Sequence, residues 1–376
     1  MKLDNRNFAG ALGIYTIGGL FWAFLPFFVG LKVSTGGFSQ TQAGSLGSAY
    51  LIGFSVASMT ALWWAGRYNW RKLAAVLAAV VIAALLLLAR VDGFALSLMI
   101  VPVVGLMMGA FWTVAYRIFS SSANPERAFS IGIVVSYSAL ALVTFVIGEY
   151  VVAGFGLSGS SYVLGGVVLV LALSALLLPR GLAAGGDSGG QASYRPSLPV
   201  ALALLAILGT SFGFAAVWAF TERIGIDAGF NTSQISPVIA SNLLASAGGS
   251  VLATLLGMRI GRMLPLFVGM LAILVSIVSL ATVDSFSTYA AAVAGLGLSI
   301  GFVMPYQMGY LAALDRNNRF VLLIAAAQGI GSAAGPFAGG AAADAGGYGL
   351  LVMVAGAVVA ASMLAILIST RVKNES

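Results

Sequence analysis

The chain contains neither cysteine nor histidine among its 376 residues. These absences exclude disulfides, thiolate nucleophiles, imidazole metal ligands and Ser-His-Asp triads. The sequence also lacks the Gly-Lys-Ser/Thr loop that holds nucleotide phosphates, which argues against ATP hydrolysis by this chain. We therefore expect no enzyme activity, no cofactor and no bound metal.

Charged residues are scarce, at 8% of the chain against 60% hydrophobic residues. A soluble chain of this length needs more charge to cover its surface. A helix of about 20 apolar residues spans the hydrocarbon core of a bilayer, whereas strands of membrane barrels alternate in polarity and these segments do not. The sequence predicts an all-α integral membrane protein. Its long uncharged runs include 73–89, 93–116, 128–148, 263–283 and 320–343.

Cutting the sequence at charged and Gly/Pro-rich clusters predicts twelve transmembrane helices. The first is too long for a secretory signal and has no A-x-A cleavage site, so we expect it to be retained. The expected spans are 8–31, 41–65, 73–89, 94–116, 128–151, 159–178, 199–221, 233–256, 264–283, 286–312, 320–343 and 348–370.

The chain matches itself at an offset of 192 residues without a gap. This unit is too long for a solenoid repeat and has the size of a six-helix bundle. We expect an N-terminal bundle at 1–180, a Gly/Ser/Pro-rich cytoplasmic linker at 181–198 and a C-terminal bundle at 199–376. Because six crossings is an even number, the two repeats are parallel. Matched places include Gly37-Phe38 with Gly229-Phe230, Val91-Asp92 with Val283-Asp284, and Gly109 with Gly301.

The basic residues set the expected orientation. With the N-terminus in the cytoplasm, fifteen of the 18 Lys and Arg residues face the cytoplasm, and only Lys32, Arg90 and Arg223 face outward. This asymmetry follows the positive-inside rule and places both termini in the cytoplasm. We expect an integral protein of a bacterial inner membrane. No nucleic-acid partner is expected, because the basic residues are spread over many short loops.

Two basic loops, after the second and eighth predicted helices, carry a family resemblance. The parallel 6+6 repeat with such loops resembles the major facilitator superfamily over the whole chain. That family's loop reads Gly-x-x-x-Asp-Arg-x-Gly-Arg-Arg, and both copies here lack its Asp, with Gly66 and Met258 in that place. The charge relay in which the family's Asp takes part is therefore not expected. The residues that match the gating loop are Arg67, Arg71, Lys72, Arg259 and Arg262.

The resemblance implies a secondary transporter that moves a small organic solute by alternating access. Drug and proton antiporters of the family carry an Arg in helix 4, where this chain has Val101, and a Gly-x-x-x-Gly-Pro-x-x-Gly-Gly pattern in helix 5. Here that pattern lies in predicted helix 11. We interpret it as close helix packing, with gating as the alternative. Its residues are Gly331, Gly335, Pro336, Gly339 and Gly340.

The resemblance also places the substrate near the membrane midplane, between the two bundles. Polar and aromatic residues at suitable positions are candidates to bind it, with interhelical hydrogen bonding and packing as the alternative roles. Arg117 either binds a carboxylate or extends to the headgroups. The aromatic candidates together with this one cation suggest an amphipathic or weakly anionic solute. The candidates are Tyr50, Trp112, Tyr116, Arg117, Tyr137, Asn242, Tyr306, Gln307, Tyr310 and Gln328.

Glu149 is the candidate for proton coupling, because an apolar run follows it and places its carboxyl group within the outer bilayer. Glu222 and Arg223 are interpreted as loop charges, with a gate pair as the alternative, and Asp344 as a helix cap. The expected partners are a small-molecule substrate, membrane lipid and protons, and uniport stays open. The alternatives are a hydrophobic drug/proton efflux antiporter and a non-transporting membrane sensor or assembly protein.

Overall fold

The computed structural model describes residues 5–65, 67–122, 125–179, 196–314, 320 and 323–375, and its regular structure is helical. Expected linker residues 181–195 and Gly66 of the basic loop lie outside the described residues. The helices are α1 Asn5–Ser34, α2 Gln40–Met59, α3 Ala61–Trp64, α4 Trp70–Leu88, α5 Phe94–Ser120, α6 Pro125–Val146, η1 Ile147–Val152, α7 Ala153–Ala172, η2 Leu173–Leu177, α8 Leu198–Asp227, α9 Thr232–Leu256, α10 Met263–Ser279, α11 Phe286–Leu314 and α12 Ile324–Glu375.

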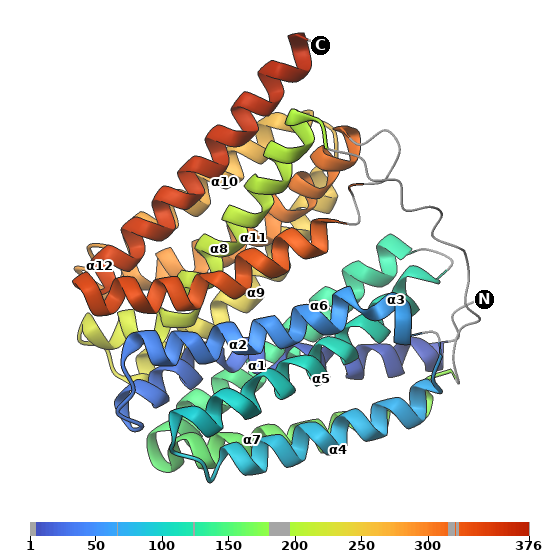
Figure 1. Cartoon of the computed structure of the whole chain (residues 1–376), viewed down its shortest axis with the longest axis vertical. Helices are drawn as coiled ribbons and strands as arrows, with labels where there is room; N and C mark the ends of the chain where they lie inside the picture. Colours follow the sequence, from blue (N-terminus) through green and yellow to red (C-terminus); the bar gives the residue numbers. More distant parts are fainter. Residues whose placement is uncertain are drawn as a thin grey trace.

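Eight helical runs in the described part of the chain are long and apolar enough to cross a membrane. Two of these runs are bent by glycine. The run from α6 to η2 bends at Gly156 (φ 55°), and α12 bends at Gly346 and Gly347 (φ 73° at Gly347). Glycine adopts a positive φ without the steric cost that a side chain brings. Figure 1 shows α12 reversing its direction at this bend.

Residues that lie 192 positions apart adopt the same local structure. A capping box starts α2 at Ser39 and α9 at Asn231, and each is completed by a glutamine three residues later. The turns before them contain the positive-φ glycines Gly37 and Gly229. The aromatic pairs Phe38–Phe94 and Phe230–Phe286 meet edge to face at 5.8 and 5.5 Å between ring centroids. The internal match in the sequence therefore has a counterpart in the caps and turns.

Close helix packing follows the same repeat. Gly105 of α5 lies so close to the Tyr50 carbonyl oxygen of α2 that an added Cβ would clash. Gly297 of α11 lies equally close to the Asn242 carbonyl oxygen of α9. Small residues permit this close approach of helix backbones. The resulting van der Waals contact holds the helices together in a bilayer, where the hydrophobic effect does not drive helices to associate. The pairs α2–α5 and α9–α11 are thus equivalent packing units.

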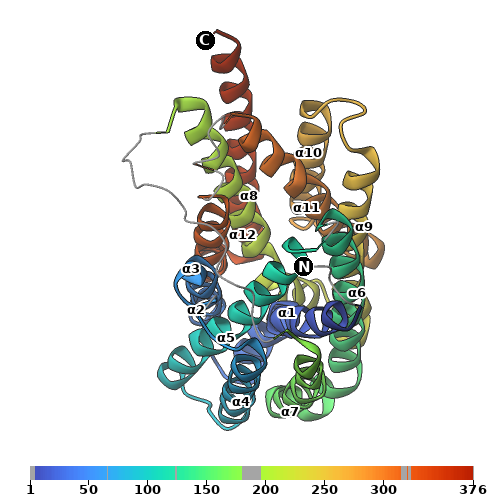
Figure 2. The ribbon, with the colours of Figure 1, turned by 90° about the vertical axis from the view of Figure 1, so that its right-hand side faces the viewer.

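The helices form two groups, which we call the first half (residues 5–179, α1 to η2) and the second half (residues 196–375, α8 to α12) (Figures 1 and 2). The halves meet along three seams, in which α1 packs on α8, α2 on α12, and α6 on α9. In Figure 1 the halves converge where α2 and α9 begin and α12 bends, and separate toward the end that carries the termini. We call the end at which the halves converge the closed end.

Several expected spans differ from the observed helices, and three of these differences are informative. The span 41–65 is split, because α2 ends at Met59 and a short α3 follows Thr60, whose hydroxyl group donates to the Val56 carbonyl oxygen. The span 128–151 continues as the π-helical η1, which contains Glu149. The span 199–221 is too short, because α8 continues to Asp227. The last difference buries a charged residue that the sequence analysis assigned to a loop.

Candidate functional site

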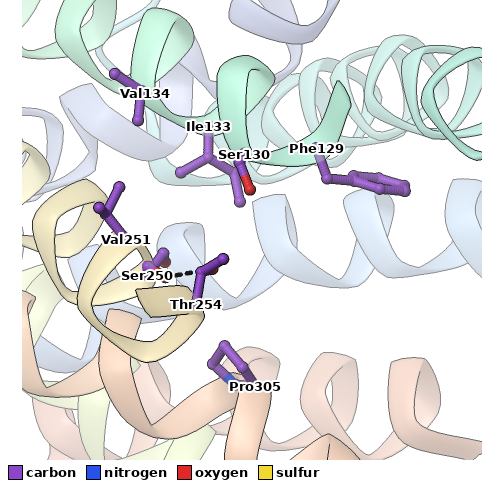
Figure 3. A pocket seen from close by; sticks show the side chains of 8 residues that line it. All are labelled: Phe129, Ser130, Ile133, Val134, Ser250, Val251, Thr254 and Pro305. Carbon is purple, nitrogen blue, oxygen red and sulfur yellow. Dashed lines mark hydrogen bonds between the residues drawn. The ribbon is translucent and has the colours of Figure 1, made fainter. Parts of the chain in front are cut away.

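A cavity of about 400 Å³ lies between the two halves, away from the closed end. The first turns of α6 form one wall, the last turns of α9 form the other, and Pro305 of α11 lies at its edge (Figure 3). Among the described residues, none of the side chains that line it is ionisable. The lining residues are Phe129, Ser130, Ile133, Val134, Ser250, Val251, Thr254 and Pro305.

The wall from the first half is extended by aromatic side chains. Phe129 meets Tyr116 edge to face at 5.1 Å, and Tyr116 is 39% exposed. Behind Tyr116 lie Trp112, at 5.5 Å, and Tyr15, whose ring centroid is 4.2 Å from that of Trp112. The structure thus brings the predicted pair Trp112 and Tyr116 next to the cavity. Phe129 was not among the predicted residues, because nothing in the sequence around it marks the face of α6 that lines the cavity.

The wall from the second half offers hydroxyl oxygens. The Ser250 hydroxyl lies 3.2 Å from the carbonyl oxygens of Ser246 and Gly301, and Thr254 donates to the Ser250 carbonyl oxygen at 2.9 Å. Because each hydroxyl has one hydrogen and two lone pairs, both keep a capacity to accept hydrogen bonds. The cavity therefore combines an aromatic wall with a wall that can accept hydrogen bonds from a solute.

Four predicted binding residues in the second half lie inside that half instead of lining the cavity. All four are buried, and each makes a hydrogen bond that joins two elements of that half. This arrangement favours the alternative role of interhelical hydrogen bonding. The bonds are Asn242 Nδ2 to Val293 O at 2.7 Å, Gln307 Nε2 to Thr210 Oγ1 at 2.8 Å, Tyr306 OH to Gly257 O at 3.0 Å, and Tyr310 OH with Ser369 Oγ at 2.8 Å.

The remaining predicted binding residues are scattered. Tyr50 is fully buried against Phe21, with ring centroids 4.9 Å apart. Gln328 donates to the Met304 sulfur at 3.1 Å. The next residue, Gly329, lies against Ser55 of the first half. Tyr137 of α6 and Arg117 near the end of α5 are half-buried. The cavity lining contains none of these side chains.

The basic loop residues do not act as one group. Arg71 donates to the carbonyl oxygen of Leu178, at the end of η2 in the same half. Arg262 lies beside Gly309 of α11, also within its own half. Arg67, Lys72 and Arg259 are exposed. Arg71 thus binds the end of η2 in the first half, and Arg262 packs beside α11 in the second half.

The glycine pattern of α12 serves two faces. Gly331, Gly335 and Gly339 are spaced by four residues and face α8 of the same half, where Gly331 lies against the Leu208 carbonyl oxygen. Pro336 and Gly340 lie one position further round and face α2 of the first half. A Cβ at Gly340 would clash with the Gln40 carbonyl oxygen. One face of α12 therefore packs within the second half, and the neighbouring face makes the contact with the first half.

Asp344 caps a helix of the opposite half. Its carboxylate accepts hydrogen bonds from the backbone N–H of Gln40 at 3.0 Å and of Thr41 at 2.8 Å, and from the Thr41 hydroxyl at 2.6 Å. These groups form the first turn of α2, where unpaired N–H groups and the helix dipole favour a negative charge. The cap expected from the sequence is present, but it joins the two halves at the closed end.

Replacing Asp344 with asparagine is expected to weaken the closed end. The change removes the negative charge and one hydrogen-bond acceptor, and should destabilise the contact between the halves by about 0.5–1 kcal/mol. This is the lower part of the range for helix caps, because the carboxylate is exposed. Ala95 and Ala281 are exposed alanines of opposite halves. Spin labels at A95C and A281C therefore report the distance between the two halves by pulsed electron paramagnetic resonance. The control is D284N, because Asp284 accepts from Thr288 within its own half. An equal change in the control contradicts a cap between halves.

The seam between α1 and α8 contains aromatic side chains and one acid. Trp218 is fully buried, donates to the Trp22 carbonyl oxygen at 3.1 Å and stacks on Phe214. One turn further along α8, the Glu222 carboxyl group lies directly on the Cα of Gly30, with 6% of the residue exposed. The assignment of Glu222 to a loop is therefore wrong, because α8 extends past it.

Comparisons with known proteins agree with this architecture. Residues 8–319 match the family profile of the Major Facilitator Superfamily. Among solved structures, the chain is similar to a mutant form of the nucleoside transporter NupG, with a TM-score of 0.78 and 12% identity. That match covers 98% of this chain and 99% of the other, and at this identity it shows the fold alone. No curated protein matches the chain.

Proposed function

This chain belongs to the Major Facilitator Superfamily and is a membrane transporter, not an enzyme; on that premise we propose that it moves a small, uncharged amphipathic solute by alternating access. The observation that carries the proposal is the cavity between the halves, which lies away from the closed end. Separation of the halves at the closed end, with approach of α6 and α9, would expose the same cavity to the other side. This is the rocking motion that two parallel repeats permit.

The chemistry of the cavity supports the class of solute. The described part of its lining carries no ionisable side chain, so a charged solute would lose hydration without gaining a partner there. The Phe129 ring and the Tyr116 ring behind it suit a flat apolar group, while Ser250 and Thr254 accept hydrogen bonds from its polar part. A weakly anionic solute is the second candidate, and Arg117 is its proposed partner.

We also propose the finer topology. The two bent runs would each cross the membrane twice, and α2 and the 17-residue α10 once each, so that with the other six candidate helices the chain crosses twelve times. The halves then correspond to bundles at 1–180 and 199–376, joined by the linker. The distribution of Lys and Arg supports cytoplasmic termini in a bacterial inner membrane.

Proton coupling at Glu149 is part of the proposal. Glu149 lies in the π-helical η1, and π-helical turns occur frequently at functional sites. Its Oε2 atom is buried and has no hydrogen-bond partner within the described residues. The neighbouring Gly148 packs on Ser236 in the α6–α9 seam, which places the acid beside a contact between halves. Uniport is the alternative.

Loss of the Phe129 ring is expected to weaken solute binding by about 10–150-fold, because burying a phenylalanine side chain contributes about 1.5–3 kcal/mol. A thermal-shift screen of the purified protein against nucleosides, sugars, amino acids, aromatic acids and lipophilic cations identifies a ligand. Its affinity is then measured for F129A and for the control F286A, whose ring packs on Phe230 in the second half. Unchanged binding by F129A contradicts the assigned cavity.

The same screen separates the candidate solute classes. Binding of a neutral amphipathic compound supports the proposal. Binding of a carboxylate that R117Q weakens supports the anionic alternative. Preferential binding of lipophilic cations supports a hydrophobic drug efflux antiporter, which the family pattern disfavours through Val101. Family membership also disfavours the non-transporting sensor, because the fold match extends over the whole chain.

A further inference from the structure

The α1–α8 seam buries a carboxyl group that the proposed cavity does not use. Glu222 lies on α8 with 6% of its surface exposed, and its Oε2 atom has no hydrogen-bond partner within the described residues. Its carboxyl group lies flat on Gly30 of the opposite half, where even an alanine Cβ would clash. Gly30 and Glu222 are 192 residues apart in the chain. Equivalent positions of the repeat therefore face each other, one with an acid and one without a side chain.

The nearby cations are engaged elsewhere. Arg223 donates to the Tyr348 hydroxyl at 3.3 Å, and Lys32 of α1 donates to the Val91 carbonyl oxygen at 3.1 Å and to Ser97 at 3.0 Å, within the first half. Both of these cations are thus turned to other partners.

The other titratable groups around Glu222 offer it no bond either. Tyr289 of α11 donates its hydroxyl hydrogen to the Thr221 carbonyl oxygen at 2.9 Å. Tyr348 of α12 accepts from Arg223, and Asp227 lies further along α8, where it is exposed. Among the described residues, these and the two cations above are the titratable and charged groups near Glu222 on its own helix and on α1, α11 and α12. None of them forms a hydrogen bond or ion pair with the carboxyl group, and only the charge of Arg223, which is turned to Tyr348, acts on it from a distance.

Burial of an unpaired carboxylate within the bilayer is costly, whereas the neutral acid fits the seam. Separation of α1 from α8 would admit water to Glu222 and remove that cost. The two charge states therefore favour different separations of the halves, which is the requirement for coupling a ligand to a conformational change. Gly30 is needed on the opposite helix, because any side chain there would keep the acid from closing on α1.

We propose that Glu222 is a proton-binding site that couples protonation to closure of the α1–α8 seam. The proposal rests on the alternating access proposed above and assigns a second acid besides Glu149. A proton bound at Glu222 favours the closed end, and its release favours separation of α1 from α8. The closed state is therefore favoured at low pH and is lost as the pH rises.

The test uses the full chain, which lacks cysteine, with spin labels at A95C and A281C in lipid nanodiscs at pH ~5.5 and ~8.5. For one titrating group the ratio of open to closed states changes at most about tenfold per pH unit. We expect the open fraction of the labelled protein to rise several-fold at the higher pH. In E222Q, which mimics the neutral acid, it should change less than about twofold, while E222D and the control D284N keep the response.

Loss of the pH response in E222Q with retention in E222D and D284N supports the assignment. A full response in E222Q, or a response abolished by D284N as well, overturns it. A labelled protein that shows no pH response also overturns it. The variant G340V then distinguishes the two proposals, because it forces the closed end apart without a proton. If G340V opens while pH has no effect, alternating access survives and Glu222 fails; if G340V does not open, both proposals fail.

Discussion

Replacement of Gly340 with valine is expected to open the closed end and to trap the transporter there. Gly340 of α12 lies against the Gln40 carbonyl oxygen of α2, so any added side chain meets the backbone of the opposite half. Overpacking of this kind costs about 1–3 kcal/mol, and the cost applies only while α2 and α12 touch. The ratio of open to closed states should therefore rise by about 5–150-fold. The spin-label distance between A95C and A281C measures this change, and transport of an identified solute should fall with it.

The matched control is G331V on the same helix. Gly331 makes an equally close approach, to the Leu208 carbonyl oxygen of α8, but within the second half. We expect it to lower the melting temperature without changing the distance between the halves. A shift of the distance distribution in G331V as large as that in G340V would show that valine on α12 acts through general destabilisation. The division of the glycine pattern between two faces would then be wrong.

Truncation of Trp218 to alanine is expected to cost about 3–5 kcal/mol of stability, the usual cost of removing a buried aromatic side chain. Trp218 is fully buried and stacks on Phe214, with ring centroids 6.2 Å apart and planes 7° apart. Its indole N–H donates to the Trp22 carbonyl oxygen of the first half at 3.1 Å. The cavity left by truncation lies in the α1–α8 seam. The melting temperature should therefore fall and the open fraction should rise together.

The control W218F keeps a ring in the seam and loses the hydrogen bond, which is expected to cost about 1 kcal/mol. The thermal unfolding of both variants is measured in the same detergent. If W218F is as unstable as W218A, the hydrogen bond to Trp22 is the main contribution, and the packing argument fails. If W218A unfolds at the temperature of the parent chain, the seam contributes little to stability.

Local features of this protein could be predicted from its sequence because they depend on neighbours in the chain. The turn before α2 contains Gly37, and Ser39 and Gln42 form the capping box that starts the helix. The same residue types recur before α9, where Asn231 replaces Ser39. The break in α12 falls at Gly346 and Gly347, between the two expected spans. Uncharged runs likewise identify apolar helices, since their length alone is compared with the bilayer thickness.

The candidate site was predicted only in part. Trp112 and Tyr116 lie beside the cavity, but Asn242, Gln307 and Tyr310 make hydrogen bonds inside the second half. In a soluble helix, the contrast of polar and apolar faces shows which side is buried. Here both the lipid-facing and the bundle-facing sides are apolar, so this contrast is missing. Phe129 was overlooked for the same reason, because nothing in its neighbourhood marks the face that lines the cavity.

The sequence by itself determined that this protein is a helical membrane protein with an internal repeat, because hydrophobic length, caps and the 192-residue match are properties of the chain. The tertiary structure alone decided which half each side chain faces. In the folded protein Glu222 is buried against Gly30, and Asp344 accepts hydrogen bonds from the first turn of α2. Some glycines of α12 pack on α8 and others on α2. The physical reason is that contacts between helices depend on rotation about each helix axis. In an apolar environment close packing sets that rotation, and hydrophobicity along the sequence does not.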